Sequence, residues 1–494
     1  METVRIDRIN NFEYSFGLSN KYGIKAVSKA LTFRNPDPYA YTQNIEKFNK
    51  RRLTFRIGML QTLLKYLRDK DISYSLRDYS YSIPENVSID DRMSGKYDYQ
   101  RRAVEAFYRR RFGIIAVPTR GGKTFIAAEI LRIFLETDSG NFLFLTDNTT
   151  LFTQAIDDIH RYFERYGGIE IGEIRAGSVD TSKRVTVGMI QTIQSAMSDR
   201  CSDREKKGAM KRYLRELRFL CVDEIHDNCS DSKLRIYKRC VGLEYQLCLS
   251  ATPYRANALV QNLKLREWSG DIVYDITEEE LRDVGVLSDY RVIMLMVDHE
   301  GHDDGVDDRD YADVRRRLMY ENERRNGVLR TTVETMRDMR LKTLVLFQSV
   351  EHGRLMSEML GETFISGETS GEDREAAKRA FLDADGGVLL ASGIFKKGVT
   401  LPEVQVLVNA DGGLEDALVI QRKGRVLGAT EGKSRSLVVD VLDVYGSYLG
   451  GHSERRMDTY LRSVGERGVT VLDTDDTSWS ETMRSATERW IFGK

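Results

Sequence analysis

The stretch Pro118-Thr119-Arg120-Gly121-Gly122-Lys123-Thr124 decides the fold of the chain around it. An apolar run at 112–117 precedes this stretch, and a helix-like run at 125–135 follows it. A strand, a glycine-rich loop and a helix in this order form a cradle in which backbone N–H groups point at phosphate groups. The sequence therefore predicts a nucleotide-binding loop, whose residues are Pro118, Thr119, Arg120, Gly121, Gly122, Lys123 and Thr124.

Two side chains of this loop suit a magnesium nucleotide. Lys123 would supply positive charge to the β- and γ-phosphates, and the Thr124 hydroxyl would hold Mg²⁺. The generic pattern begins with a glycine, but this chain has Val117 at that position. A tight turn that binds nothing is therefore the alternative interpretation of the loop taken alone.

A second motif lies downstream, where the apolar run 219–222 ends in Asp223-Glu224-Ile225-His226. Doubly wound sheets carry their chemistry at the carboxyl ends of parallel strands. Asp223 is predicted to hold the metal, and Glu224 to orient or deprotonate the attacking water. Taken alone, Asp-Glu at a strand end is equally well explained as a solvated turn. The two motifs in this order predict a motor driven by a nucleoside triphosphate.

The bulk composition limits the class of protein. The chain has 494 residues, which suggests about three or four domains. Its net charge of −1 gives no general attraction to nucleic acid, so such binding would need local basic patches.

No apolar stretch approaches the ~20 residues of a membrane span, and we expect no membrane partner. The N-terminus lacks the apolar core of a signal peptide. Five cysteines without a C-x-x-C pair favour reduced thiols rather than zinc, and hence a cytoplasmic protein.

The spacing of apolar runs and turn residues predicts the domain organisation. The polar stretch at 82–91 is typical of a linker, so we expect a small α+β domain at 1–90. Strand–helix alternation then predicts two α/β domains with parallel sheets, at 91–286 and 287–450, followed by a charged C-terminal tail at 451–494. The clearest expected strands are 112–117, 142–146, 185–187, 219–222, 246–249, 343–347, 387–391, 404–409 and 436–441.

Further residues agree with a motor driven by a nucleoside triphosphate. The Gln100 amide, upstream of the loop, is expected to read the adenine edge, with a helix-surface glutamine as the alternative. Ser250-Ala251-Thr252-Pro253 would place two hydroxyls beside the carboxylates. Gln421 and Arg425 are predicted to be catalytic, because an arginine from a neighbouring domain stabilises charge on the transferring phosphoryl group. The alternative for this last segment is an amphipathic helix with a basic outer face.

Together, these motifs resemble those of superfamily-two helicases. The ordered set comprises Gln100, the Gly-Lys-Thr loop, Asp-Glu-Ile-His, Ser-Ala-Thr-Pro, Gly398 in Phe-Lys-Lys-Gly-Val-Thr-Leu, and Gln-x-x-Gly-Arg ending at Arg425. The resemblance spans about 99–441 and is greatest to the DExH branch that includes XPB, RecG and the bacteriophage UvsW type. It implies two tandem RecA-like domains, ATP and Mg²⁺ as cofactors, and a nucleotide contact at Gly398. One departure is Gly428, which stands where the family usually has a second arginine.

The resemblance implies an ATP-dependent DNA helicase or translocase acting on branched, forked or single-stranded DNA in recombination, repair or replication restart. It also implies 3′ to 5′ movement and a location in the cytoplasm of a bacterial or phage-infected host cell. Candidate DNA contacts are 146–150, Gln191, Thr192, Gln348, Ser349, Lys396 and Lys397. Basic and aromatic residues at 48–56 suit a DNA-contacting surface, which would make 1–90 a DNA-binding domain, or a half-buried strand. The competing interpretations are an RNA helicase, a restriction-system motor and an ATP-gated binding scaffold that does not hydrolyse ATP.

Overall fold

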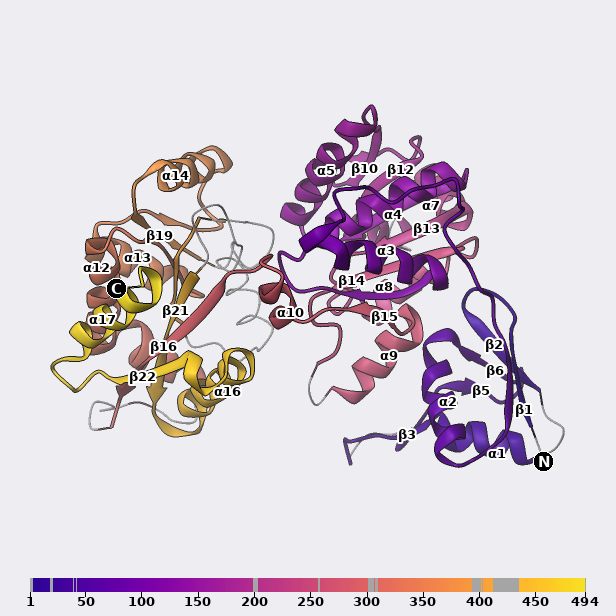
Figure 1. Ribbon diagram of the computed structural model, residues 1–494, viewed down its shortest axis with the longest axis horizontal. Helices are drawn as coiled ribbons and strands as arrows, with labels where there is room; N and C mark the ends of the chain where they lie inside the picture. Colours follow the sequence, from indigo (N-terminus) through magenta and orange to yellow (C-terminus); the bar gives the residue numbers. More distant parts are fainter. Residues whose placement is uncertain are drawn as a thin grey trace. The chain divides into compact units, whose positions relative to one another are not determined.

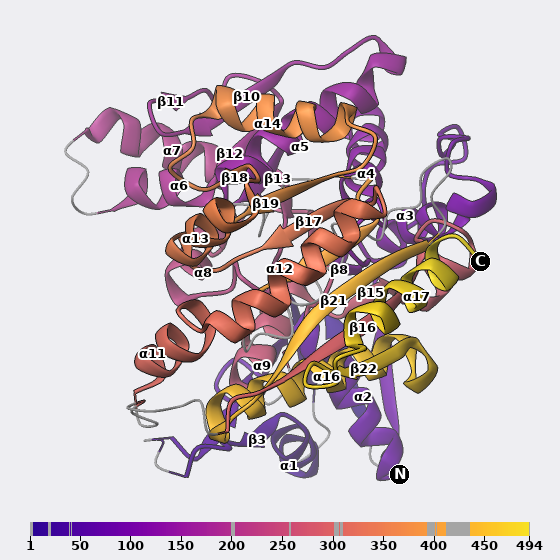
Figure 2. The ribbon, with the colours of Figure 1, turned by 90° about the vertical axis from the view of Figure 1, so that its left-hand side faces the viewer.

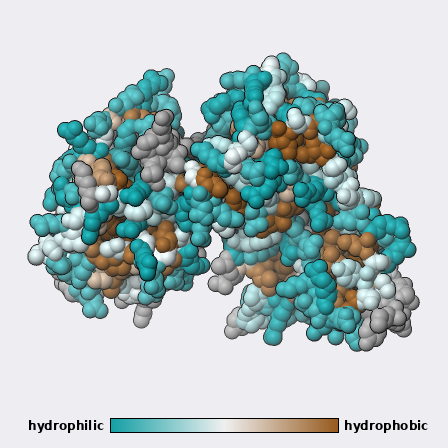
Figure 3. All heavy atoms as spheres, in the orientation of Figure 1, coloured by the Kyte–Doolittle hydropathy of each residue, from teal (hydrophilic) through white to brown (hydrophobic). Residues whose placement is uncertain are grey.

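The computed structural model describes the chain except for residues 1–2, 18–20, 39, 41, 199–202, 256–257, 301–305, 307–309, 393–400, 402, 412–434 and 494. It divides into two compact units, Met1–Thr277 and Glu278–Lys494 (Figure 1). Within the described residues, no helix is long and apolar enough to cross a membrane. Hydrophilic residues predominate on the face shown in Figure 3.

The first unit begins with a small α+β domain. Its elements are β1 (Val4–Arg8), β2 (Glu13–Gly17), α1 (Lys21–Ala30), β3 (Thr32–Arg34), β4 (Asn44–Glu46), β5 (Phe48–Asn49), β6 (Thr54–Arg56), η1 (Ile57–Met59), α2 (Leu60–Asp69) and β7 (Tyr74–Arg77). Five strands form one mixed sheet in the order β5-β6-β2-β1-β7. Residues of α1 and α2 pack on it, with Ile6, Val27 and Leu63 fully buried in the shared core. In the segment 48–56, Phe55 is buried and Arg51 and Arg52 are exposed, as expected for a half-buried strand and its turn.

A parallel sheet forms the second part of this unit, here called domain one. Its elements are η2 (Gly95–Tyr97), α3 (Asp98–Arg110), β8 (Phe112–Ala116), α4 (Lys123–Thr137), β9 (Asn141–Thr146), α5 (Thr149–Phe163), η3 (Glu164–Tyr166), β10 (Ile171–Arg175), β11 (Ser178–Val179), β12 (Val185–Met189), α6 (Ile190–Met197), α7 (Arg204–Glu216), β13 (Leu217–Val222), α8 (Asp231–Tyr237), β14 (Tyr245–Ser250), α9 (Leu259–Ser269) and β15 (Ile272–Asp275). The strand order is β11-β10-β12-β9-β13-β14-β8-β15, and only β11 runs antiparallel to its neighbour. The central strands are continuous apolar runs because helices cover both faces of the sheet.

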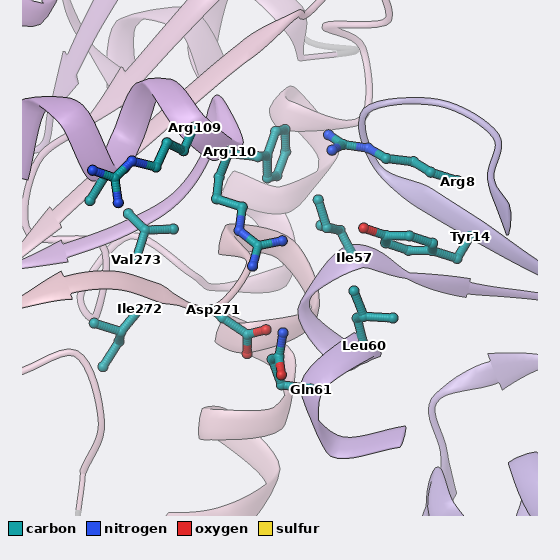
Figure 4. A pocket seen from close by; sticks show the side chains of 12 residues that line it. Arg8, Tyr14, Ile57, Leu60, Gln61, Arg109, Arg110, Asp271, Ile272 and Val273 are labelled. Atoms are coloured by element: carbon teal, nitrogen blue, oxygen red, sulfur yellow. The ribbon is translucent and has the colours of Figure 1, made fainter. Parts of the chain in front are cut away.

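The α+β domain lies against the edge of domain one at which the parallel strands begin. Phe12 packs edge-to-face on Phe112, the first residue of β8, with ring centroids 5.1 Å apart. The Arg56 guanidinium lies 4.4 Å from the ring centre of Trp268 at the end of α9. The Asn11 amide donates to the carbonyl of Leu243, just before β14. Figure 4 shows this seam, where Arg8 and Tyr14 face Arg110 and Asp271. The phosphate loop after β8 and the carboxylates after β13 therefore lie at the opposite ends of these strands.

The segment 82–91, predicted to be a linker, is held against domain one. The Asp90 N–H donates to Glu129 Oε1 on α4 at 2.8 Å, and the Tyr166 hydroxyl donates to Asp90 Oδ2 at 2.6 Å. The Arg92 guanidinium binds the Asp90 carboxylate and lies over the Phe125 ring. These contacts hold the pKa of Asp90 well below its usual range, principally through the Arg92 hydrogen bonds that overcome burial. The segment that connects the α+β domain to domain one is therefore fixed against domain one.

We expect Gly58→Ala to disturb this seam. A Cβ atom at residue 58 would overlap the backbone carbonyl of Arg266 in α9. Overpacking of this kind costs about 1–3 kcal/mol, so thermal unfolding should show a melting temperature lower by roughly 2–12 °C. Gly208→Ala is the control, because its Cβ in the middle of α7 would meet only the end of the Arg212 side chain, at 4.0 Å. Equal melting temperatures for the two variants would contradict the close approach of the two domains.

The second unit, here called domain two, contains a seven-stranded sheet whose described pairings are all parallel. Its elements are α10 (Glu278–Asp283), β16 (Asp289–Asp298), α11 (Tyr311–Val314), η4 (Arg315–Tyr320), α12 (Glu323–Asp338), β17 (Lys342–Leu346), α13 (Val350–Leu360), β18 (Phe364–Ile365), α14 (Gly371–Asp383), β19 (Gly387–Ala391), β20 (Val406–Asn409), β21 (Arg435–Val444), η6 (Gly446–Gly450), α16 (Gly451–Val464), η7 (Glu466–Gly468), β22 (Val469–Asp473) and α17 (Trp479–Ile491). The strand order is β18-β19-β17-β20-β21-β16-β22. Residues of α12, α13 and α17 share the core on one face, which Figure 2 presents to the viewer. The two parallel sheets and the small α+β domain confirm the predicted fold class.

The residues expected to form a C-terminal tail are instead part of domain two. β22 pairs with β16 and forms an edge of the sheet. On α16, Arg456 and Tyr460 both bind the buried Asp440 carboxylate, at 3.2 and 2.8 Å. On α17, the Trp490 indole donates to the carbonyl of Ser436 at 2.7 Å. The boundary expected at 286/287 falls in the loop before β16, whereas the compact unit itself begins at Glu278.

Candidate functional site

The glycine-rich loop lies between β8 and α4, as the sequence indicates. The Gly121 N–H donates to the carbonyl of Pro118 at 3.0 Å, which closes a turn. Gly122 has φ 79° and is the N-cap of α4, so its left-handed backbone leads directly into the helix. The first N–H groups of a helix have no partner within it, and they attract anions. Val117, which replaces the usual first glycine, is buried and extends the sheet by donating to the Ser250 carbonyl.

Lys123 and the two carboxylates meet beside this loop. The Lys123 ammonium group donates to the Val117 carbonyl at 3.3 Å and lies 3.9 Å from Glu224 Oε1. Asp223 follows β13, and its carboxylate accepts the Glu224 N–H at 2.9 Å. Burial and then the Glu224 charge raise the pKa of Asp223 to about 7, although Lys123 acts in the opposite direction. A bound cation would favour the ionised form of this carboxyl group.

The Glu224 carboxylate is also connected to the Ser-Ala-Thr-Pro segment. The His226 Nδ1 atom lies 3.4 Å from Glu224 Oε2 and 2.9 Å from the Ser250 hydroxyl, which itself accepts the Thr252 N–H. Glu224 has φ 43°, an uncommon conformation for a residue other than glycine. Its Oε2 atom is buried and accepts no hydrogen bond from the described part of the chain. A carboxylate oxygen in this state retains its capacity to accept a proton or a hydrogen bond from a reactant.

Gln100, on α3, contacts the glycine-rich loop. Its amide donates to the Tyr99 hydroxyl at 3.1 Å and lies 3.5 Å from the Gly121 carbonyl, which also accepts from Tyr99 at 2.8 Å. A Cβ at residue 122 would lie 2.5 Å from the Gln100 amide nitrogen. The structure therefore places Gln100, which is buried, against the phosphate loop; the expected adenine contact stays a prediction. Arg120 has φ 70° at the tip of the turn.

The loops after neighbouring strands of domain one are joined to one another. The Gln191 amide donates to the Asp147 carbonyl at 2.7 Å, which links the ends of β12 and β9. Lys233 on α8 donates to Asn228 Oδ1 at 2.6 Å and lies 3.4 Å from the Asp147 carboxylate. Sequence reasoning missed Lys233 and Asn228, because both lie outside any recognisable motif. The structure thus joins two of the expected nucleic-acid segments, 146–150 and Gln191-Thr192, to the loop that carries Glu224.

The predicted site residues of domain two are only partly described. Gly398, Gln421 and Arg425 lie outside the described residues, as do Lys396, Lys397 and Gly428. The remaining expected contacts, Gln348 and Ser349, follow β17 at the N-terminus of α13. The Asp411 carboxylate accepts the N–H groups of both residues, and Arg315 donates to Gln348 Oε1 at 3.0 Å.

The donor set of domain one suits a magnesium nucleotide. Mg²⁺ is usually bound by one or two protein ligands together with substrate phosphates and water. Thr124 and Asp223 offer such a pair, and no cluster of three or more His, Cys, Asp or Glu residues suited to a metal occurs in the described parts of the chain. The described cysteines, Cys221, Cys229, Cys240 and Cys248, carry free thiols.

Comparisons with known proteins define the class. Residues 94–255 match the family described as type III restriction enzyme, res subunit, and residues 327–429 match the helicase conserved C-terminal domain. The chain is therefore an ATP-hydrolysing helicase of superfamily two, with two RecA-like helicase domains.

Similar proteins place it near the UvsW and XPB types. It is 22% identical to the ATP-dependent DNA helicase uvsW of Enterobacteria phage T4 over 385 residues, which cover 75% of this chain and 73% of the phage protein. It is 24% identical to the DNA 3′-5′ translocase XPB2 of Sulfurisphaera tokodaii, covering 74% of this chain and 84% of XPB2. Its fold resembles that of the type ISP restriction-modification enzyme LlaBIII, with a TM-score of 0.57, 14% identity and coverage of 85% of this chain and 35% of LlaBIII. These relatives support a DNA helicase that binds ATP.

Proposed function

We propose that the chain is an ATP-driven DNA translocase that unwinds or branch-migrates forked and junction DNA, in recombination, repair or replication restart. The observation that carries the proposal is the convergence of Lys123, Asp223 and Glu224 beside the helix N-terminus. Lys123 would bind the β- and γ-phosphates, while Thr124 and Asp223 would hold Mg²⁺. Bound Mg²⁺ neutralises charge on the phosphates during transfer.

Glu224 would orient the attacking water and accept its proton. Its Oε2 atom supports this role, because it accepts no hydrogen bond from a described residue, although His226 Nδ1 lies 3.4 Å away. His226 would keep the carboxylate oriented, since its own ring is fixed by Ser250. Gln421 and Arg425 would complete the site from domain two, and Gly398 would contact the nucleotide. These three assignments are part of the proposal.

We expect Ser250→Ala to reduce ATP turnover by about tenfold or more. The change removes the hydroxyl that fixes the His226 ring, so the Glu224 carboxylate loses its orientation. Misplacing a reacting group by about 1 Å can cost about a hundredfold in rate. Steady-state hydrolysis and nucleotide affinity should be measured together, with the exposed Ser182→Ala as the control. Unchanged turnover in Ser250→Ala would exclude this positioning role.

Nucleic acid would lie over the joined strand-end loops of domain one. Short polar side chains and backbone amides hold phosphates there without requiring a basic protein overall. The loops at 146–150 and Gln191 are linked through Asp147 to the segment bearing Glu224. This link would couple DNA binding to ATP hydrolysis. Kinship to UvsW and XPB types supports DNA, 3′ to 5′ movement and branched substrates. A cytoplasmic setting belongs to the same proposal.

The function is tested by measuring ATP hydrolysis in parallel with single-stranded DNA, duplex DNA, a four-way junction and single-stranded RNA. We expect strong stimulation by single-stranded and junction DNA and little by intact duplex. Stimulation by RNA alone would make the chain an RNA helicase. Absence of hydrolysis with every nucleic acid would make it an ATP-gated scaffold.

A further inference from the structure

We propose that the seam between the α+β domain and domain one binds a single strand of DNA. This inference rests on the proposed function and names a surface for its substrate. Two hollows lie along the seam. A groove of about 730 Å³ separates α2 from α9, and a pocket of about 320 Å³ lies between β1, α2 and α3 (Figure 4). Gln61 lines both hollows. Arg266 of the groove is ion-paired to Asp271 of the pocket at 2.6 Å, so the hollows are neighbours.

The seam has the charge that a phosphate backbone requires. Three cationic residues and one acidic residue line each hollow, whereas the whole chain has 75 cationic and 76 acidic residues. In the groove, Lys65 and Arg68 are exposed and form no ion pair with a described residue. In the pocket, Arg8 and Arg110 are both ion-paired to Asp78 at 3.2 Å, and the Nη2 atom of the buried Arg8 has no hydrogen-bond partner in the described structure. The positive charge available to a phosphate backbone is therefore that of Lys65 and Arg68 in the groove, because the arginines of the pocket are ion-paired to carboxylates.

The groove also offers aromatic faces. Tyr66 of α2 and Tyr254 beyond β14 line it from the two domains, and Tyr254 is 37% exposed. Partly exposed tyrosine rings in a basic groove are suited to stacking on unpaired bases, whereas the bases of a duplex are already stacked on one another. Tyrosines and cations together thus favour a single strand over a duplex as the occupant.

The groove is connected to the hydrolytic carboxylate. Tyr254 follows the Ser-Ala-Thr-Pro segment, in which Thr252 donates its N–H to the Ser250 hydroxyl at 3.1 Å. Ser250 contacts His226, and His226 contacts Glu224. A strand that fixes Tyr254 would therefore also restrict the segment that orients Glu224. This connection gives the seam a means to affect ATP hydrolysis as well as to bind DNA.

The test measures the affinity of the full chain for a fluorescent oligothymidine strand, without nucleotide, by anisotropy. Tyr254→Ala and Tyr66→Ala should each weaken binding by about tenfold, the size expected for one lost base stack. Tyr254→Phe should retain most of the affinity, because the ring remains. Arg68→Gln should weaken binding and make the affinity fall less steeply as the salt concentration rises, because one phosphate contact is lost. Lys70 is exposed but does not line the groove, so Lys70→Gln should change neither the affinity nor its salt dependence.

A second measurement does not depend on substitutions. A strand carrying 5-bromouracil should form photo-crosslinks that mass spectrometry maps to Tyr254 or Tyr66. Crosslinks confined to other segments, or equal affinity for Tyr254→Ala, Tyr66→Ala and wild type, would overturn the assignment of the seam. If wild-type ATPase is not stimulated by any DNA, the proposed function fails; if it is stimulated while the seam variants bind normally, only this inference fails.

Discussion

Glu224→Gln is expected to abolish most ATP turnover while leaving nucleotide binding largely intact. The amide keeps the size of the carboxylate but cannot accept a proton from the attacking water. General base catalysis typically contributes about 10²–10⁴-fold to a rate, so the DNA-stimulated kcat should fall by that order. The structure supports a large effect because Glu224 Oε2 is buried and accepts no hydrogen bond within the described chain.

The control for Glu224→Gln is a variant that loses another carboxylate, one that is not expected to affect ATP turnover. Glu216→Gln provides it, because Glu216 is exposed at the end of α7 in the same domain. Turnover by single-turnover kinetics and affinity for a fluorescent ATP analogue should be measured for both variants. If Glu224→Gln hydrolyses ATP at the wild-type rate, Glu224 has no part in the chemical step.

Lys123→Ala is expected to lose turnover and nucleotide affinity together. The Lys123 ammonium group is the cation that faces Glu224, at 3.9 Å, and it also lowers the pKa of Asp223 against the effect of burial. Its loss would remove positive charge from the phosphate site and leave two neighbouring carboxyl groups less compensated. Removal of one preorganised donor to developing charge costs about 10²–10³-fold in kcat.

Lys211→Ala is the matched control, since Lys211 is exposed on α7 and remote from the loop. Isothermal titration with MgADP and steady-state hydrolysis would separate binding from catalysis. Wild-type affinity and turnover in Lys123→Ala would mean that the loop does not hold the nucleotide.

Much of the fold could be predicted because buried parallel strands leave a clear pattern. The runs at 112–117, 142–146, 219–222 and 246–249 correspond to β8, β9, β13 and β14, which are buried on both faces and mostly apolar. The strands missed by the sequence reasoning include β10, β15 and β22, which lie at or near sheet edges and are only partly buried. The sequence of β22 looks like part of a charged tail, because an edge strand is only partly buried and needs no continuous apolar run.

The candidate site was predictable where adjacent residues share one loop. Lys123 and Thr124 are positioned by the loop itself, and Asp223 and Glu224 by the end of one strand. The position of Gln100 depended on a tertiary contact with Gly121 and Gly122 that sequence spacing cannot reveal. The bridge from Lys233 to Asp147 has the same origin, since α8 and β9 meet only after folding. The docking of the α+β domain at the opposite edge of the sheet was not foreseen for this reason.

The most direct test is a crystal structure of the chain with magnesium and a non-hydrolysable ATP analogue. The account predicts that the Lys123 ammonium group contacts the β- and γ-phosphate oxygens and that Mg²⁺ lies between Thr124 and Asp223, with Glu224 facing the γ-phosphate. A nucleotide bound elsewhere, with Lys123 still donating to the Val117 carbonyl, would contradict it.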